Sequence, residues 1–239
     1  TGGPTQPVVV GIAAINDFHG ALEPPRQSVP TLAPTDIRPD REGRPEERLL
    51  DPNVNVVQVP AGGAAYLASA IDAIRAKYPH AVTVSAGDMI GASQLASSLF
   101  LDEPAVGVMN RIGLDFNAVG NHEFDLGAEE LQRLVNGGCE QHSQRKPCQI
   151  EKWAGAKFPF LAANSIRPGG STLFPGTALK SFGKGRGKVT LGFIGITLKA
   201  TSDLVSRENL QGMTFADEAD TVNALVPALK RHGADAVVL

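Results

Sequence analysis

The feature of this sequence that most constrains its fold is an alternation of short apolar runs with amphipathic helical patterns. Residues 8–15 form a near-continuous apolar run that starts with β-branched residues, which is typical of a buried strand. A helix is predicted to begin at Gly62-Gly63 and to stop before Pro79, with its apolar residues on one stripe. Further strands are predicted at 81–85, 116–119, 158–163, 188–197 and 234–239, and further helical stretches at 93–100, 104–112, 126–135 and 215–232. This alternation predicts an α/β fold with a substantially parallel, buried sheet.

Two glycine- or proline-rich stretches interrupt the alternation. The stretch from residue 21 to about Pro60 carries seven prolines before Pro60 itself, among many charges, which predicts a long surface loop. Residues 183–188 combine glycines with lysine and arginine, but they lack the spacing of a phosphate-binding loop and precede a predicted strand. We therefore expect a hairpin turn there.

Bulk composition excludes two classes of partner. Twenty-two basic and 25 acidic residues leave a net charge of −3, so the sequence offers no basic face for nucleic acid. No apolar run approaches the roughly 18 residues that a membrane helix requires. We expect a monomeric protein with no membrane span and no nucleic-acid partner.

Three predicted strands end in polar clusters of the same kind. Asp17 and His19 follow the first strand, Gly87-Asp88 follows the next, and Gly120-Asn121-His122-Glu123 follows the third. Ligands of open α/β sheets bind at the carboxyl ends of the strands. Carboxylate, imidazole and amide donors together suit a divalent ion of borderline hardness. If two such ions lie about 3.5–4 Å apart, one carboxylate must bridge them, and Asp88 is the natural candidate because it is the lone acid of its cluster.

Each cluster alone has an ordinary structural explanation. Asp17 and His19 could be a turn residue and a surface histidine, Asp88 could cap a helix, and residues 121–123 could cap a turn. The order of the three clusters and their common position at strand ends favour the metal site. Glu123 is assigned a capping position and no catalytic role.

The same blocks resemble those of a known family. Asp17-Phe18-His19-Gly20, Gly87-Asp88 and residues 120–125 resemble the successive motifs of the calcineurin-like metallophosphoesterases. The flanking residues 15–20, 62–65 and 119–127 resemble the 5′-nucleotidase branch, which includes UDP-sugar hydrolases and 2′,3′-cyclic-nucleotide phosphodiesterases. The resemblance covers essentially the whole chain and implies a four-layer α/β/β/α sandwich with two central sheets between helices.

The resemblance also implies a role for each site residue. Asp17 and His19 would bind the first of two divalent ions, Asp88 would bridge, and Asn121 would bind the second. The ions would be Mn, Zn, Co or Mg, and the resemblance does not identify them.

The remaining two residues would serve the reaction itself. His122 would interact with the phosphoryl group in the transition state or protonate the leaving alkoxide. Asp125 would hydrogen-bond the imidazole of His122 and favour its charged form.

The sequence departs from the family pattern at its carboxyl end. The family's remaining ligands are histidines on two later loops, and residues 237–239 resemble the strand before the first of those loops. We therefore expect residues 1–239 to form an incomplete metallophosphoesterase domain, truncated at its C-terminal end and without the family's C-terminal nucleotide-binding domain. Such a chain would bind metal weakly and hydrolyse little by itself.

The two cysteines bear on the compartment. Cys139 and Cys148 lie in one polar loop and would close a short disulfide in an oxidising compartment. Free thiols, or metal ligation together with His142, are the alternatives. Residues 1–7 show no signal peptide, so the protein is either cytosolic or already processed. The family resemblance favours a periplasmic or secreted protein.

The expected function is hydrolysis of nucleotide phosphate monoesters by a water that two metal ions activate, with a small-molecule nucleotide as substrate. Cyclic-nucleotide phosphodiesterase and UDP-sugar hydrolase activities use the same motifs, and a thiosulfohydrolase of the same superfamily is a more distant alternative. A non-catalytic nucleotide-binding or surface-adhesion module is the alternative from another class. The His122–Asp125 pair argues against it, because binding alone needs no such dyad.

Overall fold

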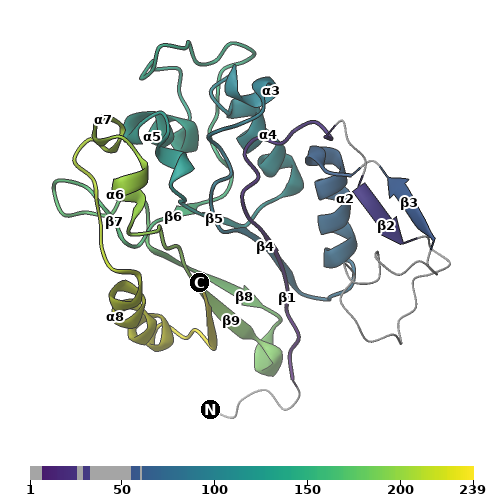
Figure 1. The fold of residues 1–239 in the computed structure, drawn as a ribbon. Coiled ribbons are helices and arrows are strands. Elements are labelled where there is room, and N and C mark those ends of the chain that lie inside the picture. Colours follow the sequence, from purple (N-terminus) through teal and green to yellow (C-terminus); the bar gives the residue numbers. More distant parts are fainter. Residues whose placement is uncertain (1–6, 26–28, 33–54, 60) are drawn as a thin grey trace.

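A parallel sheet forms one half of the molecule. The computed structural model describes residues 7–25, 29–32, 55–59 and 61–239 (Figure 1). Its first sheet has the strand order β1 (Gly11–Ile15), β4 (Ala81–Ser85), β5 (Phe116–Ala118), β6 (Phe160–Leu161), and every neighbouring pair is parallel. All four strands were predicted, and their shared direction places the four carboxyl ends at one edge of the sheet.

The second sheet is mixed. Strand β9 (Val189–Ile194) lies between β11 (Ala236–Val238), which is parallel to it, and β8 (Thr177–Phe182), which is antiparallel. The turn between β8 and β9 contains the short helix η3 (Gly185–Gly187), so the predicted hairpin turn at 183–188 is confirmed. A small antiparallel pair, β7 (Ser165–Ile166) with β10 (Thr214–Phe215), lies outside both sheets.

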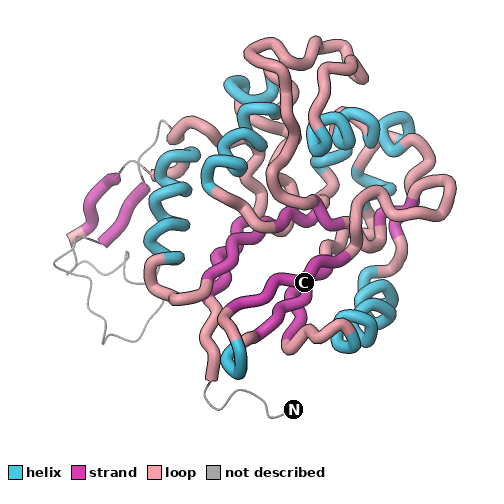
Figure 2. Tube along the Cα trace, turned by 180° about the vertical axis from the view of Figure 1, so that it is seen from behind, coloured by secondary structure: helices cyan, strands magenta, loops and turns pink. Residues whose placement is uncertain are grey.

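The two sheets pack face to face between helices. Side chains of both sheets form one apolar cluster: Val82, Leu161, Phe182, Leu191 and Phe193. Helices α2 (Gly63–Arg75), α4 (Glu103–Ile112) and α5 (Ala128–Asn136) supply the core on the outer face of the first sheet. Helix α8 (Glu218–Arg231) covers the second sheet (Figure 2). Its Leu229 belongs to an apolar cluster with Ile194 of β9. This arrangement confirms the four-layer α/β/β/α sandwich.

Short elements account for the differences from prediction. The predicted loop to residue 60 contains β2 (Val29–Leu32) and β3 (Val56–Val59), an antiparallel pair in which five of the eight residues are β-branched. Residues 26–28, 33–54 and 60 lie outside the described part. Helix α3 (Leu95–Ser98) lies within the helical stretch predicted at 93–100. Helices α6 (Thr201–Leu204) and α7 (Arg207–Leu210) and the 3₁₀ helix η2 (His122–Phe124) were not predicted and are single turns. Such turns are too short to show a helical period. None of the helices in the described ranges has the length and apolar character of a membrane span.

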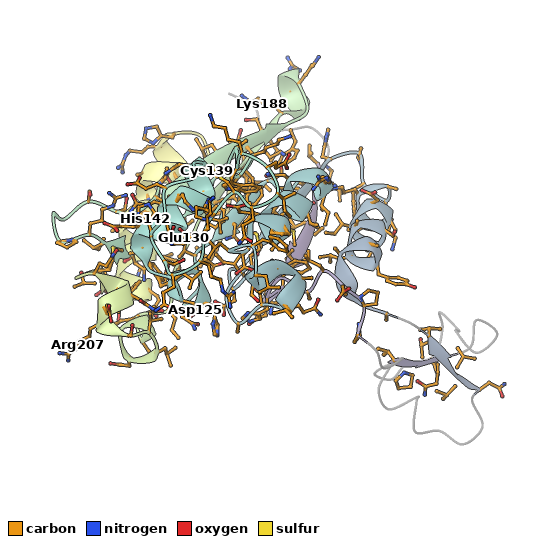
Figure 3. The ribbon with its side chains drawn as sticks, turned by 90° about the horizontal axis from the view of Figure 1, so that it is seen from above. Asp125, Glu130, Cys139, His142, Lys188 and Arg207 are labelled. Carbon is orange, nitrogen blue, oxygen red and sulfur yellow. A yellow bond between two sulfur atoms is a disulfide. The ribbon has the colours of Figure 1, made fainter. Side chains whose placement is uncertain are left out.

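A disulfide closes the loop that follows α5. Cys139 and Cys148 are bonded, which confirms the first interpretation of this pair and excludes both free thiols and a metal site with His142. His142, labelled with Cys139 in Figure 3, instead lies between two carboxylates, 3.5 Å from Glu129 and 3.7 Å from Glu140.

A buried ion cluster anchors this loop to the helices. The Arg133 side chain is only 2% exposed, and its guanidinium lies 2.8 Å from Glu103 and 2.7 Å from Glu130. The N–H of Cys148 donates to the same Glu103 carboxylate at 3.1 Å. Breaking one partner of such a cluster leaves an uncompensated buried charge, so α4, α5 and the disulfide loop are held as a unit.

Candidate metal centre

The loops that follow β1 and β4 run side by side at the carboxyl edge of the first sheet. The N–H of Asp17 donates to the carbonyl of Gly87 at 3.1 Å, and the N–H of His19 donates to the carbonyl of Asp88 at 3.0 Å. The loop that follows β5 joins them, because the N–H of His122 donates to the Asp88 carboxylate at 2.9 Å. The three polar clusters of the sequence thus meet at one place.

Three side chains from these loops could hold a metal ion. One ligand atom each from His19, Asp88 and His122 lies within 4.8 Å of the other two. The two imidazole rings meet edge to face, with their centroids 4.8 Å apart. Nitrogen donors with one carboxylate match the donor set that borderline divalent ions prefer, so the residues fit a metal ion.

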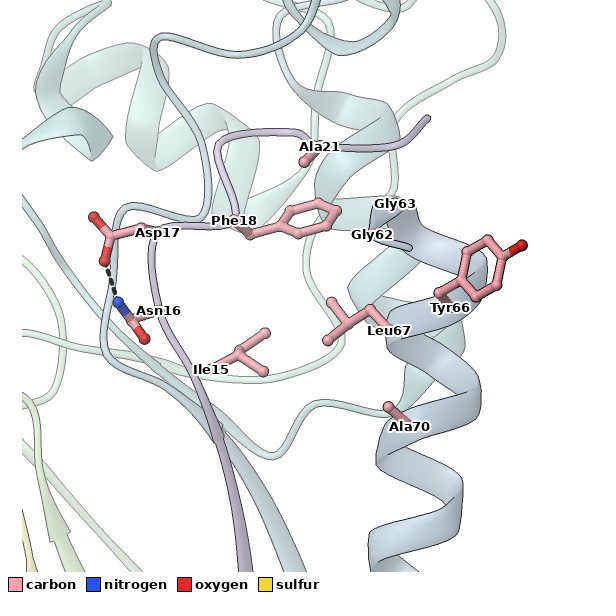
Figure 4. A pocket seen from close by; sticks show the side chains of 10 residues that line it. All are labelled: Ile15, Asn16, Asp17, Phe18, Ala21, Gly62, Gly63, Tyr66, Leu67 and Ala70. Atoms are coloured by element: carbon pink, nitrogen blue, oxygen red, sulfur yellow. Dashed lines mark hydrogen bonds between the residues drawn. The ribbon is translucent and has the colours of Figure 1, made fainter. Parts of the chain in front are cut away.

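Asp17 borders this cluster. Its carboxylate lies 3.7 Å from Nε2 of His19, and its other oxygen accepts a hydrogen bond from the Asn16 amide. A cavity of about 470 Å³ lies between the end of β1 and α2, lined largely by apolar side chains. Figure 4 shows the polar ends of Asn16 and Asp17 on the opposite side of the chain from Leu67, which points from α2 toward Ile15.

Asn121, the predicted ligand of the second ion, directly precedes His122 in the chain. It is half-buried at the start of η2, where its carbonyl accepts the N–H of Phe124 at 3.1 Å. Among the described residues, the side chains grouped closely enough to hold a metal ion are those of His122, which follows Asn121, and of two predicted ligands, His19 and Asp88. The ligand roles of Asp17, His19, Asp88 and Asn121 therefore all stay predictions.

The tautomer of His19 is set by its surroundings. Nδ1 of His19 lies 2.7 Å from the carbonyl oxygen of Gly91. A carbonyl only accepts hydrogen bonds, so the proton of a neutral imidazole sits on Nδ1 and Nε2 keeps its lone pair. A histidine held in this way presents Nε2 to a metal ion.

His122 and Asp125 form the predicted dyad. Nδ1 of His122 lies 2.9 Å from the carboxylate of Asp125. The hydrogen bond to Asp125 raises the pKa of His122 above 6.5, against the opposing effect of partial burial. The backbone of this pair is held from α7, since the Asn209 amide donates to the Asp125 carbonyl at 2.8 Å. At neutral pH the imidazole is therefore more often charged than a free histidine.

Glu123 has a larger role than its sequence suggested. Its side chain is 2% exposed and its carboxylate accepts three backbone N–H groups: Asp88 at 2.9 Å, Met89 at 2.9 Å and Gly120 at 2.6 Å. Burial raises the pKa of Glu123 to about 7, although the N–H donors oppose this change. Glu123 therefore ties the loop that carries Asp88 to the loop that carries His122. No sequence signal distinguished it from an ordinary turn-capping glutamate.

Two glycines permit the close approach of these loops. A Cβ at Gly120 would lie 2.2 Å from Oδ1 of Asp88, and one at Gly87 would lie 2.6 Å from the nitrogen of Gly120. Gly87 also has a φ of +100°. The site therefore requires glycine directly before Asp88 and directly before Asn121, because a side chain at either position would collide with the neighbouring loop.

Three predicted metal ligands have a strained backbone. Asp17, His19 and Asp88 have φ of 50°, 45° and 49°, in the left-handed region. Each such residue costs about 1–2 kcal/mol, and strain of this kind concentrates at functional sites. The packing of the three loops must therefore hold these residues against their own preference.

Comparison with known proteins places this geometry in context. No family model matches the chain. The "Uncharacterized protein in pqq-V 5′region" of Acinetobacter calcoaceticus is 48% identical over 177 residues, which cover 73% of this chain and 79% of that protein. Endonuclease YhcR of Bacillus subtilis is 32% identical over 99% of this chain and 17% of its own length.

A third relative has a solved structure. NAD 5′-nucleotidase of Haemophilus influenzae is 25% identical over 97% of this chain and 32% of its own length. The structure of Haemophilus influenzae NAD nucleotidase matches with a TM-score of 0.63 at 23% identity, over 95% of this chain and 33% of that chain. The chain thus spans about four-fifths of the first relative, but only about a sixth and a third of the other two.

Proposed function

Because this chain belongs to the 5′-nucleotidase family of the calcineurin-like metallophosphoesterase superfamily, we propose that it carries part of the catalytic domain of a metal-dependent nucleotide hydrolase. The observation that supports this most is the convergence of His19, Asp88 and His122 at the carboxyl edge of the first sheet. The residue types, their order along the chain and their position in the fold agree with phosphoester hydrolysis. The family is one of hydrolytic enzymes; because the chain spans about a third of NAD 5′-nucleotidase, the activity proposed is that of the whole protein.

We assign two metal ions to this centre. Asp17 and His19 would hold the first, Asn121 would hold the second, and Asp88 would contact both. When bound, divalent ions offset charge on the phosphoryl oxygens and supply a water that ionises near neutral pH. The chain's own contribution is to present Nε2 of His19 and the free oxygen of Asp88 in fixed positions.

His122 serves the leaving group in this proposal. Asp125 holds a proton on Nδ1 of the imidazole, so Nε2 faces the centre. In the charged imidazole, Nε2–H donates to a phosphoryl oxygen and passes its proton to the departing alkoxide. The raised pKa of His122 keeps this proton available at neutral pH.

The substrate class proposed is a nucleotide 5′-phosphate monoester. 2′,3′-Cyclic nucleotides and UDP-sugars are the alternatives within the family. The disulfide is typical of oxidising compartments, which supports a periplasmic or secreted location.

The test is a metal-reconstitution assay with four substrates. The full-length protein that contains this chain is stripped with EDTA, supplied with Mn²⁺, Zn²⁺, Co²⁺ or Mg²⁺, and assayed on AMP, 2′,3′-cyclic AMP, UDP-glucose and single-stranded DNA. We expect metal-dependent phosphate release from AMP and its loss in Asp88→Asn. Asp72→Asn, an exposed acid on α2, is the matched control and should leave turnover unchanged.

Each other outcome is informative. Preference for the cyclic nucleotide or for the UDP-sugar would replace the proposed substrate by that alternative and leave the family unchanged. Cleavage of DNA alone would contradict the proposal of a nucleotide substrate. Binding of AMP without turnover under any metal would favour the non-catalytic module. Hydrolysis that survives EDTA or Asp88→Asn would overturn the metal mechanism.

A further inference from the structure

The peptide group that joins Gly91 to Ala92 takes part in the hydrogen bonding of both histidines of the metal centre. The carbonyl of Gly91 accepts the hydrogen bond from Nδ1 of His19 at 2.7 Å. The N–H of Ala92, the other end of the same peptide group, donates to Oδ2 of Asp125 at 3.2 Å. That oxygen is also 2.9 Å from Nδ1 of His122. A rotation of this single peptide would disturb both histidines at once.

The peptide is tightly packed. A Cβ at Gly91 would lie 2.4 Å from the carbonyl oxygen of His122 and 2.6 Å from Oδ2 of Asp125. The φ of Gly91 is +78°, which favours glycine. A side chain at this position would overlap His122 and Asp125, so only glycine fits there. The Gly91 carbonyl also accepts the Ser93 hydroxyl at 3.3 Å, and the Gly91 N–H faces the other side of the loop.

Asp102 occupies that other side. Its Oδ2 accepts the N–H of Gly91 at 3.2 Å, and its Oδ1 accepts the hydroxyl of Ser97 at 2.6 Å. Asp102 is 5% exposed and lies outside the sequence clusters that predicted the site. The two hydrogen bonds account for both oxygens of a buried carboxylate.

The Asp102 side chain does not cap the helix that it precedes. Asp102 is the N-cap of α4, where an aspartate commonly accepts an N–H of the first helical turn, yet its side chain makes no such bond. Its φ of 59° is in the left-handed region. A residue that accepts backbone strain and gives up capping must gain its stabilisation elsewhere, and the Asp102 side chain contacts Gly91 and Ser97.

We propose that Asp102 is a positioning residue, which fixes the Gly91–Ala92 peptide and through it the tautomer of His19 and the His122–Asp125 pair. The catalytic consequence rests on the proposed function. The positioning itself is a property of the metal-free protein and can be tested without any turnover.

Two substitutions separate hydrogen bonding from backbone shape. Asp102→Asn keeps both contacts, because its carbonyl accepts the Gly91 N–H and its amide donates to the Ser97 oxygen; asparagine also tolerates the left-handed region. Asp102→Gly removes both contacts and relieves the backbone strain, so it should fold. Gln211→Gly, at a φ of 53° after α7, is the matched control for a glycine in that region.

The primary measurement is the imidazole tautomer. The metal-free chain is labelled with ¹⁵N-histidine, and long-range ¹H–¹⁵N spectra are recorded at a pH where the imidazoles are neutral. The chain has five histidines, so the ring signals can be assigned by substitution. We expect His19 to carry its proton on Nδ1 in the wild type, Asp102→Asn and Gln211→Gly, and to become a mixture of tautomers in Asp102→Gly.

The second measurement is the affinity for Mn²⁺ by titration calorimetry. Loss of an outer-shell partner typically weakens metal binding about 10–100-fold, so we expect at least about a tenfold loss in Asp102→Gly and near-wild-type affinity in Asp102→Asn. If Asp102→Gly does not fold, Ser97→Ala removes one of the two bonds and should shift the tautomer and the affinity in the same direction, by less.

The outcomes divide clearly. A wild-type tautomer and affinity in Asp102→Gly, equal defects in the Asn and Gly variants, or a wild-type His19 protonated on Nε2 would each overturn the positioning role. A protein that hydrolyses no nucleotide but shows the expected tautomer change would refute the proposed function and leave this inference standing.

Discussion

The buried carboxylate of Glu123 offers the sharpest quantitative test of the site. Glu123→Gln preserves the shape of the side chain but cannot ionise. The pKa of Glu123 in the folded protein is about 7, against an ordinary value of 4.5. Between these two pH values the unfolded chain has lost a proton that the folded chain keeps, so the folded state loses stability as pH rises. At 1.36 kcal/mol per pKa unit, the loss is about 3 kcal/mol and is complete above pH 7.

The variant should lack this pH dependence. Below pH 4.5 both side chains are neutral, so the difference in free energy of unfolding between the two proteins is constant there and serves as the baseline. By pH 8 the metal-free Gln variant should have gained up to about 3 kcal/mol over the wild type relative to this baseline. It should nevertheless bind Mn²⁺ more weakly, because its NH₂ group faces N–H donors that the carboxylate accepted and the Asp88 loop loses part of its support.

The assay is urea unfolding of both proteins in EDTA from pH 4 to pH 8, with the difference in free energy of unfolding plotted against pH. Other titrating groups cancel in this difference. A pH-independent difference would refute the reasoning. A wild-type advantage that grows with pH would show that the three N–H donors outweigh burial and hold the pKa of Glu123 below its ordinary value.

Three further predictions follow from contacts at and near the site. Asp125→Asn should lower the pKa of His122, measured by NMR titration, and shift the alkaline limb of the pH–rate profile downward, because the dyad stabilises the charged imidazole; an unchanged pKa would contradict that assignment. Gly120→Ala should abolish measurable Mn²⁺ binding in calorimetry while the chain stays folded by circular dichroism, since its Cβ overlaps Oδ1 of Asp88; wild-type affinity would show that the loops can separate. Reduction of the disulfide should lower the free energy of unfolding by about 2–3 kcal/mol in urea titrations, and no change would mean that the buried ion cluster alone holds the loop.

The elements of the site that repeat a pattern were predictable from the sequence. Apolar runs followed by polar clusters located β1, β4 and β5, and the parallel sheet then brought His19, Asp88 and His122 together. Contacts between residues distant in sequence carried no such pattern. Asp102 reads as an ordinary helix cap, and only the tertiary structure turns its carboxylate toward Gly91.

The missed elements have related causes. Strand β8 carries Lys180 and Ser181 among its apolar residues, and its pairing with β9 depends on the turn between them. Single-turn helices such as α7 give no period, although Asn209 from α7 holds the carbonyl of Asp125. A sequence pattern indicates regular elements, because their residues repeat at a fixed spacing. The contacts that support a site join residues far apart in the chain, and these become visible only in the folded structure.

The two sheets use separate stretches of the chain: among the described strands, the first sheet takes residues 11–161 and the second takes residues 177–238. During vectorial synthesis, or passage through a translocation pore with the amino end leading, the first sheet can therefore pair before any part of β8 has emerged. His19, Asp88 and His122 would then be neighbours before the second sheet exists, because all three follow strands of the first sheet.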